Sequence, residues 1–343
     1  MSSYPLSVKI WLIVGLFMVF MQVIIGGITR LTGSGLSITK WEIVTGTLPP
    51  MNEKAWDEAF DLYKETPQYQ KINEGMSMGQ FKFIYFWEYF HRVWARSMGF
   101  VFLLPYLFFW RKGYIDKRLM RRLGIVILLA AVVASFGWIM VASGLVERPW
   151  VNAYKLTLHL SLALILFSYL YYTTVRVFQE KPLVIDAKAL QWMNMILFFL
   201  VLQIILGGIM SGMKAALVYP TWPDMHGQWI PDVLLTGSEW KLGNFVMYDQ
   251  NHFMPAFIQF FHRLTAYILF VLIIVFALKK KSDYRIKKGS WIMLGMAFVQ
   301  VLLGILTVIH SKGIVPVGLG VYHQAGALIL LLAVLYIRFS LKR

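Results

Sequence analysis

The chain has 343 residues, of which 58% are hydrophobic and only 15% charged; because a soluble domain usually carries about 25% charged residues, an ordinary soluble protein is excluded. The net charge of +16 lies in short basic clusters between apolar runs, a pattern typical of membrane topology, so nucleic-acid binding is not expected. Since the chain contains no cysteine, disulfides, iron–sulfur clusters and thiolate-ligated or c-type heme are excluded as well.

Eight apolar segments are long enough to cross the bilayer as helices, which takes about 20 residues each. In chain order we expect them at 9–29, 84–110, 122–143, 155–176, 190–211, 254–278, 290–310 and 320–340. None has the alternating pattern of a transmembrane β-barrel strand. The sequence therefore predicts an all-α polytopic membrane protein.

The basic residues predict the orientation of these helices. They gather after the second, fourth and sixth segments and at the C-terminus: Arg111, Lys112, Lys117, Arg118, Arg121, Arg122, Arg176, Lys181, Lys188, Lys279, Lys280, Lys281, Arg285, Lys287, Lys288, Lys342 and Arg343. The positive-inside rule assigns these positions and both termini to the cytoplasm. The N-terminus runs into the first apolar segment without a cleavage site or transit peptide. We therefore expect a multi-pass protein of a bacterial cytoplasmic (inner) membrane.

The two long outer connections, 30–83 and 212–253, are expected to form compact lids and not disordered linkers, because tryptophans lie among their glycines and prolines. Residues 52–65 read as a short amphipathic helix capped by Asn52.

The two halves of the chain resemble each other. QVIIGGITR begins at Gln22 and QIILGGIMS at Gln203, while EYFHR and QFFHR end at Arg92 and Arg263. Each half has four segments, so the chain returns to its starting side and the repeats are parallel, related by an axis along the membrane normal. We expect two pseudo-symmetric four-helix bundles, at 1–180 and 181–343.

Four histidines recur near the outer ends of the even-numbered segments: His91, His159, His262 and His323. A membrane histidine can simply bond across a helix interface, but recurrence in an internal repeat favours function. Two histidines on facing helices of a bundle are the usual way to hold heme by both axial positions. The remaining histidines, His226, His252 and His310, have no partner in the repeat and are interpreted as loop or interface residues.

Glu88 breaks the symmetry, because the second half has Gln259 in its place. It lies one helical turn before His91 and faces the same side. Either it reaches toward water at the membrane edge, or the first half performs proton chemistry that the second half lacks. Arg92 and Arg263 either pair with heme propionates or extend to lipid headgroups. The glycines near the histidines either admit a flat macrocycle or pack neighbouring helices.

The strings GGITRLTGSGLSITKWEIVTGTLPP (26–50), EYFHR (88–92) and FFHR of the second half resemble the heme A synthase (Cox15/CtaA) family over essentially the whole chain. The absence of cysteine resembles the cysteine-free branch of that family, which includes mitochondrial members.

The resemblance implies that the protein oxidises a methyl group of heme O to a formyl group by successive hydroxylations, giving heme A for aa3-type terminal oxidases. It implies a resident heme b held by His262 and His323 in the second half. His91 and His159 would flank the substrate heme O, with Glu88 as the essential acid. Heme O synthase and oxidase assembly factors are the implied partners. The electron donor (a quinol or a small redox protein), the oligomeric state and the release of the hydroxylated intermediate stay open.

Two other functions fit parts of the pattern. A diheme b-type electron carrier, such as a quinol oxidoreductase, would use two bis-histidine hemes, but two equivalent relay hemes need no acid on one side only. A transporter built on the same repeat usually breaks its helices near the midplane, whereas these segments look continuous. We therefore predict the synthase.

Overall fold

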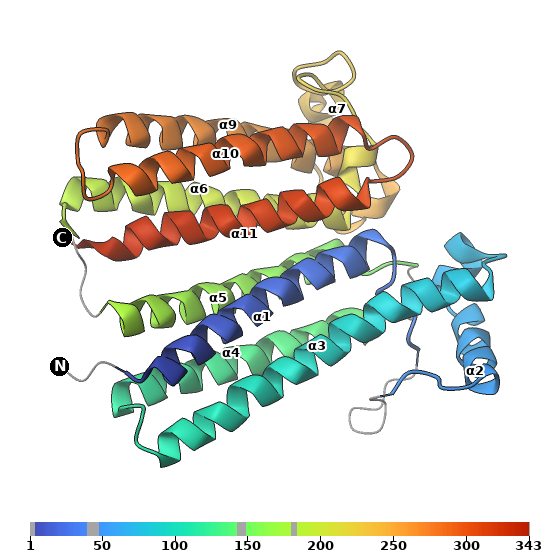
Figure 1. Ribbon diagram of the computed structural model, residues 1–343. Helices are drawn as coiled ribbons and strands as arrows, with labels where there is room; N and C mark the ends of the chain where they lie inside the picture. The colour runs from blue at the N-terminus through green and yellow to red at the C-terminus, as the bar shows by residue number, and fades with distance from the viewer. Residues whose placement is uncertain (1–3, 40–47, 143–148, 180–183, 343) are drawn as a thin grey trace. The chain divides into compact units, whose positions relative to one another are not determined.

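The structure is a computed structural model that describes residues 4–39, 48–142, 149–179 and 184–342 (Figure 1). Within these ranges eight helices are long and apolar enough to cross a membrane. They are α1 (Leu6–Leu31), α3 (Met78–Arg111), α4 (Lys117–Ala142), α5 (Ala153–Phe178), α6 (Ala187–Gly212), α9 (Phe253–Lys279), α10 (Lys287–Ile309) and α11 (Val317–Ser340). All eight predicted segments are confirmed as helices, and the protein is an all-α polytopic membrane protein. Of the basic residues used for orientation, Lys181 and Arg343 lie outside the described residues.

Local capping sets where several of these helices begin. Ser77 and Gln80 form a reciprocal capping box at the start of α3, which satisfies two backbone N–H groups that the first turn leaves free. The Asp186 carboxylate accepts the Ala189 N–H at 2.8 Å at the start of α6. At the other ends, basic residues such as Arg111 and Lys279 occupy the last turn, where they offset the negative end of the helix dipole.

The chain forms two compact units, Met1–Thr174 and Val175–Arg343. In the first unit, blue to green in Figure 1, α1 packs along α3. The indole of Trp11 donates to the Val101 carbonyl oxygen at 2.9 Å and packs against Phe102. By contrast, the residues of α4 that are buried, Leu119, Leu123 and Val126, all lie in its first ten positions. The rest of α4 is loosely packed in this unit.

In the second unit, green to red in Figure 1, the four long helices close into a bundle: α6 packs on α9 and α11, and α10 packs on the same two helices. A short parallel strand pair, β1 (Val184–Ile185) with β2 (Leu341–Lys342), joins the start of α6 to the end of α11. Arg176 donates to the Phe339 carbonyl oxygen at 2.8 Å, which explains why the last turn of α5 groups with this unit.

The predicted helix in the first outer connection is confirmed as α2 (Glu53–Lys64), with the Asn52 side chain accepting the Ala55 N–H at 2.9 Å. Its apolar face packs against the start of α3 in a cluster formed by Phe60, Tyr63, Phe81 and Ile84. Tyr63 is fully buried, so the interior of this lid excludes water, and this burial raises the pKa of the Tyr63 hydroxyl to about 12. A short π-helical turn, η1 (Tyr69–Asn73), follows α2.

The second outer connection consists of short turns and helices: η2 (Ala215–Leu217), α7 (Asp232–Leu235), η3 (Gly237–Glu239), α8 (Leu242–Val246) and η4 (Tyr248–Gln250). The indole of Trp240 packs edge-on against the rings of Phe253 and Phe257 of α9 and donates to the Leu234 carbonyl oxygen at 2.9 Å. Both outer connections are therefore compact over their described residues; positions 40–47, within the 26–50 motif, lie outside the description.

Candidate functional site

Each of the four recurring histidines faces a glycine of a neighbouring helix. A methyl group built on these glycines would lie close to the nearest ring atom: 3.1 Å for Gly26 and His91, 2.9 Å for Gly137 and His159, 3.1 Å for Gly207 and His262, and 3.0 Å for Gly304 and His323. Those distances are too short for a side chain without movement of the ring. The glycines therefore make room for the imidazoles, and the same contact recurs in both units.

Three of the four imidazoles also contact a glutamine that lies one turn before the glycine on the same helix face. The carboxamide nitrogen lies 3.0 Å from His91 Nε2 for Gln22, 3.1 Å from His262 Nε2 for Gln203, and 3.1 Å from His323 Nδ1 for Gln300. At the fourth position, before Gly137, the chain has Val133. The site facing His159 is therefore the exception.

The sequence indicated Gln22 and Gln203 only as markers of the repeat and did not predict their contact with histidine, although the chain carries a signal for it. The strings QVIIG, QIILG and QVLLG begin at Gln22, Gln203 and Gln300, and each places a glutamine four residues before the glycine. A polar residue repeated at one helical spacing within apolar runs is costly unless it has a partner. The corresponding string before Gly137 is VASFG.

The second-unit pair fits two axial ligands of one iron. The ring centres of His262 and His323 lie 6.5 Å apart, with their planes at 73°. Metal–imidazole bonds of about 2 Å on each side would place two such ring centres roughly 6 Å apart. Over the described residues, His262 Nδ1 is buried without a hydrogen-bond partner. A nitrogen lone pair of this kind suits a metal, and a neutral imidazole brings no charge into the membrane.

The first-unit histidines, His91 on α3 and His159 on α5, belong to the same compact unit. His91 and His159 lie close enough to interact electrostatically, and His159 Nδ1 is another buried ring nitrogen without a hydrogen-bond partner in the part of the chain that the structure describes. Both side chains are half-buried. This pair has the same donor chemistry as the second, but only His91 is held by a glutamine.

Glu88 lies at the centre of a hydrogen-bond cluster that joins α3 to the segment after α1. Its Oε2 accepts from the Ser37 N–H at 2.7 Å, the Ser37 hydroxyl at 2.7 Å and the Ile38 N–H at 2.8 Å. Its Oε1 forms an ion pair with Arg92 at 2.5 Å. Glu88 is only 3% exposed, so the interpretation that it reaches water at the membrane edge is wrong. Both of its oxygens are held as acceptors.

A glycine turn presents those donors to Glu88. Gly33 has a φ of +70°, a left-handed conformation that favours glycine, and the next residue, Ser34, donates its N–H to the Thr29 carbonyl oxygen at 2.9 Å. The chain thus reverses directly after α1. In the TGSGLS part of the motif, Gly33 therefore allows the turn, and Ser37 contacts Glu88.

The equivalent place in the second unit has the opposite polarity. Gln259 is fully buried and donates to the Tyr219 carbonyl oxygen at 2.8 Å. Arg263 donates to the carbonyl oxygens of Thr221 and Asp224, both at 2.7 Å. The first unit thus offers N–H groups to a carboxylate, whereas the second offers carbonyl oxygens to an amide and a cation. Burial raises the pKa of the nearby Tyr219 hydroxyl.

The other three histidines take part in turns and helix ends. His226 has a φ of +54° and donates its N–H to the Thr221 hydroxyl at 2.8 Å. His252 is the N-cap residue of α9. His310 follows α10, and its Nδ1 lies 2.8 Å from the Leu306 carbonyl oxygen. Each lies outside the two helical pairs.

Comparison with known proteins assigns this arrangement to a family. The model of the COX15-CtaA family, described as a cytochrome oxidase assembly protein, matches residues 9–335. The protein named heme A synthase of Nitrosospira multiformis is 38% identical over 98% of this chain and 94% of its own length. The protein of that name from Flavobacterium psychrophilum is 38% identical over 97% of this chain and 98% of its own length. The one from Parvibaculum lavamentivorans is 39% identical over 93% of this chain and 90% of its own length. The chain therefore belongs to the COX15-CtaA family.

Proposed function

We propose that this chain is a heme A synthase, which oxidises a methyl group of heme O to a formyl group by successive hydroxylations. The observation that carries the proposal is the group of hydrogen bonds around Glu88, because it is present beside only one of the two histidine pairs. The relatives and the family support the same activity. They give no support to the alternative of a diheme electron carrier, which would need no acid on one side only.

The second unit holds a resident heme b through His262 and His323. Three observations support this assignment: the ring separation of 6.5 Å, the glutamine on each of the two imidazoles, and the closed packing of α6, α9, α10 and α11. A ligand held by two oriented imidazoles in a closed bundle exchanges slowly. This site therefore serves electron transfer and not turnover.

The first unit binds heme O between His91 and His159. The substrate must enter and leave, and α4 is buried only at one end of its length. His159 is the histidine whose neighbouring helix has valine in place of glutamine, so its ring contacts the Val133 backbone there and no carboxamide. If His159 binds the substrate iron, it would do so without the carboxamide partner that the other three imidazoles have.

When heme O is bound, its iron supplies the oxidising power for the chemistry at the porphyrin methyl group. The residues of the chain supply position and exclusion of water. Gly26 and Gly137 leave room for the two imidazoles, and Gln22 orients His91. Glu88 holds the segment at Ser37 against α3 and brings a charge pair with Arg92 one turn from His91.

The proposed location is the inner membrane of a bacterium, with both termini and the basic connections in the cytoplasm. The eight apolar helices support a multi-pass protein, and the basic clusters support this orientation. Protease added to intact spheroplasts tests it, because the connections between α1 and α3 and between α6 and α9 should be cut while those after α3 and α9 stay intact. Cleavage only after opening the cells would refute the orientation.

The activity is tested by co-expressing the chain with heme O synthase and separating the extracted hemes by chromatography. We expect heme A and a hydroxylated precursor, both absent from the same strain carrying heme O synthase alone. A preparation that yields heme b and unchanged heme O would contradict the synthase and favour the electron carrier.

A further inference from the structure

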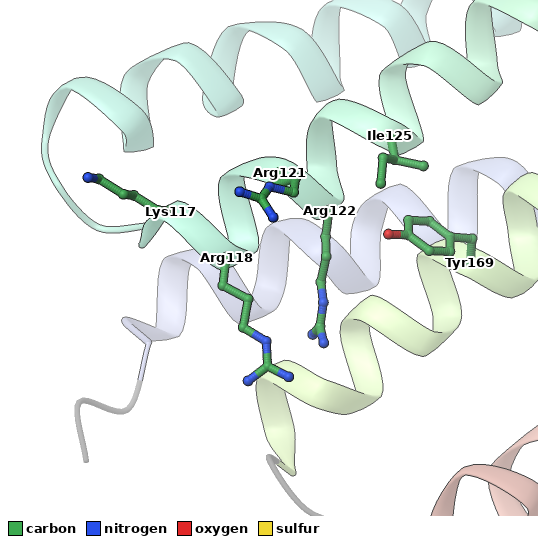
Figure 2. Close-up of a pocket in the computed structure, with 6 residues that line it drawn as sticks. All are labelled: Lys117, Arg118, Arg121, Arg122, Ile125 and Tyr169. Carbon is green, nitrogen blue, oxygen red and sulfur yellow. The ribbon is translucent and has the colours of Figure 1, made fainter.

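A pocket of about 440 Å³ lies between α4 and α5, away from the histidine pairs. Its lining consists of Lys117, Arg118, Arg121, Arg122, Ile125 and Tyr169. In Figure 2 the side chains of Arg118 and Arg122 extend in the same direction, toward α5, and the Tyr169 hydroxyl points toward Arg122. The pocket therefore combines four cations, a hydroxyl group and an apolar side chain.

Among the described residues, no carboxylate pairs with the positive charges of this pocket. The carboxylate next to them in sequence, Asp116, accepts the Leu119 N–H at 2.7 Å and so caps the helix. All four cations lie in the first two turns of α4, at the positive end of the helix dipole, where further positive charge is destabilising. An anion in the pocket would remove this penalty.

The positive-inside rule alone does not account for cations that lack a carboxylate partner in the part of the chain that the structure describes, because several basic residues at the matching end of the second unit have partners within the protein. There Lys280 pairs with Asp186, and Arg285 pairs with Asp283 at 2.9 Å. Lys279 packs over the ring of Trp192, 4.4 Å from its centre. Both connections are basic, as topology requires. In the first connection, by contrast, the four cations around the pocket have no carboxylate partner among the described residues.

We propose that this pocket binds the phosphate groups of an anionic phospholipid, with a lipid that carries two phosphates binding best. Guanidinium groups match phosphate oxygens with paired hydrogen bonds, and basic pockets between membrane helices suit such headgroups. Four cations match two phosphates better than one. Ile125, 39% exposed on the membrane-spanning part of α4, provides an apolar path for an acyl chain.

The chemistry on the Tyr169 side of the pocket fits the same ligand. The Arg122 guanidinium packs over the Tyr172 ring, 5.2 Å from its centre, which fixes its position beside α5. The Tyr169 side chain is half-buried, and its hydroxyl can donate to a phosphate oxygen. Such a bound lipid would tie α4, whose buried residues all lie in its first ten positions, to α5.

The test uses the purified full chain and counts bound lipid by native mass spectrometry in detergent. The probes are tetraoleoyl cardiolipin, dioleoyl phosphatidylglycerol, dioleoyl phosphatidylcholine and inorganic phosphate. We expect cardiolipin to bind best and phosphatidylcholine not to bind specifically. Replacing Arg118, Arg121 and Arg122 by glutamine should weaken cardiolipin binding on the order of 100-fold, taking about fivefold for each cation.

A matched variant removes the same charge elsewhere. Lys281, Lys287 and Lys288 are exposed in the basic connection of the second unit, so replacing these three by glutamine should leave cardiolipin binding unchanged. An equal loss in both triple variants, or equal binding of cardiolipin and phosphatidylcholine, would overturn the proposal. Binding of inorganic phosphate without any lipid preference would overturn it too, since the pocket would then be a free-anion site. The single variant Arg118→Gln keeps the test valid if the triple variant fails to fold.

Discussion

The imidazole rings of His262 and His323 lie edge-on to each other with their centres 6.5 Å apart, although the two residues are 61 positions apart in the sequence. From this pair we predict that His262→Ala or His323→Ala removes the low-spin heme absorbance of the purified protein. His91→Ala should leave that absorbance in place, because its ring belongs to the first unit. His310→Ala is the matched control on a helix end. Retention of the full low-spin spectrum in either second-unit variant would refute the pairing.

The role of the glycine beside each imidazole can be tested with two glycines of the same helix, α10. We predict that Gly304→Ala disturbs the resident heme, because the new methyl group would lie 3.0 Å from Cε1 of His323. Gly295→Ala should leave the spectrum unchanged, since no atom lies within 4 Å of a methyl group there. Alanine should even stabilise that helical position by up to about 1 kcal/mol. Absorbance spectra and melting curves measure both effects, and equal spectra for the two variants would exclude a positioning role for Gly304.

The glutamines supply a third prediction. When one imidazole nitrogen binds a metal, the other carries a proton and needs an acceptor. Gln300 Oε1 is buried without a donor among the described residues, so rotating its carboxamide would provide that acceptor in exchange for the bond that its NH₂ group donates to the His323 carbonyl oxygen. Gln300→Leu should therefore weaken heme binding about tenfold or more while leaving both ligands present. Heme titration of the apoprotein measures this change.

Val133→Leu is the control for the glutamine prediction, because it changes the equivalent position beside His159 without altering any hydrogen bond to the resident site. Unchanged heme affinity in Gln300→Leu would mean that the carboxamide serves only helix packing. Gln300→Glu, which keeps an acceptor at the ring, should retain most of the affinity that leucine loses.

The spans, the lid helix and the recurring histidines were predictable because each rests on a local pattern: length of an apolar run, a capping residue or an internal repeat. The partners of Glu88 were not, because Ser37 lies 51 positions away and only the turn at Gly33 brings it back. The two-residue strands β1 and β2 are also fixed by tertiary contact alone. Gln22 and Gln203 were noticed as repeat markers, but their contact with histidine needed the helix pairing.

The two contacts of the Asp186 carboxylate, with the Ala189 N–H and with Lys280, predict that the stability of the protein depends on pH. The hydrogen bond from the Ala189 N–H, and then the ion pair with Lys280, hold the pKa of the Asp186 carboxyl below its ordinary value. A group with a lowered folded pKa stabilises the fold above its unfolded pKa, about 4, and loses that contribution as the pH falls further. Asp186→Ala should therefore lower the free energy of unfolding at pH 7, by about 1 kcal/mol for loss of the helix cap alone. The difference from the parent should shrink below about pH 4. Glu58→Gln, on exposed α2, should show no such trend.

Glu88→Gln removes charge at the point where the two units differ most. One end of the glutamine would be an NH₂ group, which cannot accept from Ser37, Ile38 or Arg92. Either the loop loses its acceptor or Arg92 loses its counter-charge, each costing about 1–3 kcal/mol locally. We predict that resident heme stays bound while heme A no longer accumulates, as measured by chromatography of extracted hemes. Glu58→Gln controls for loss of a carboxylate, and normal heme A in Glu88→Gln would remove Glu88 from the mechanism. Loss of resident heme as well would instead assign Glu88 to folding, because that heme belongs to the other unit.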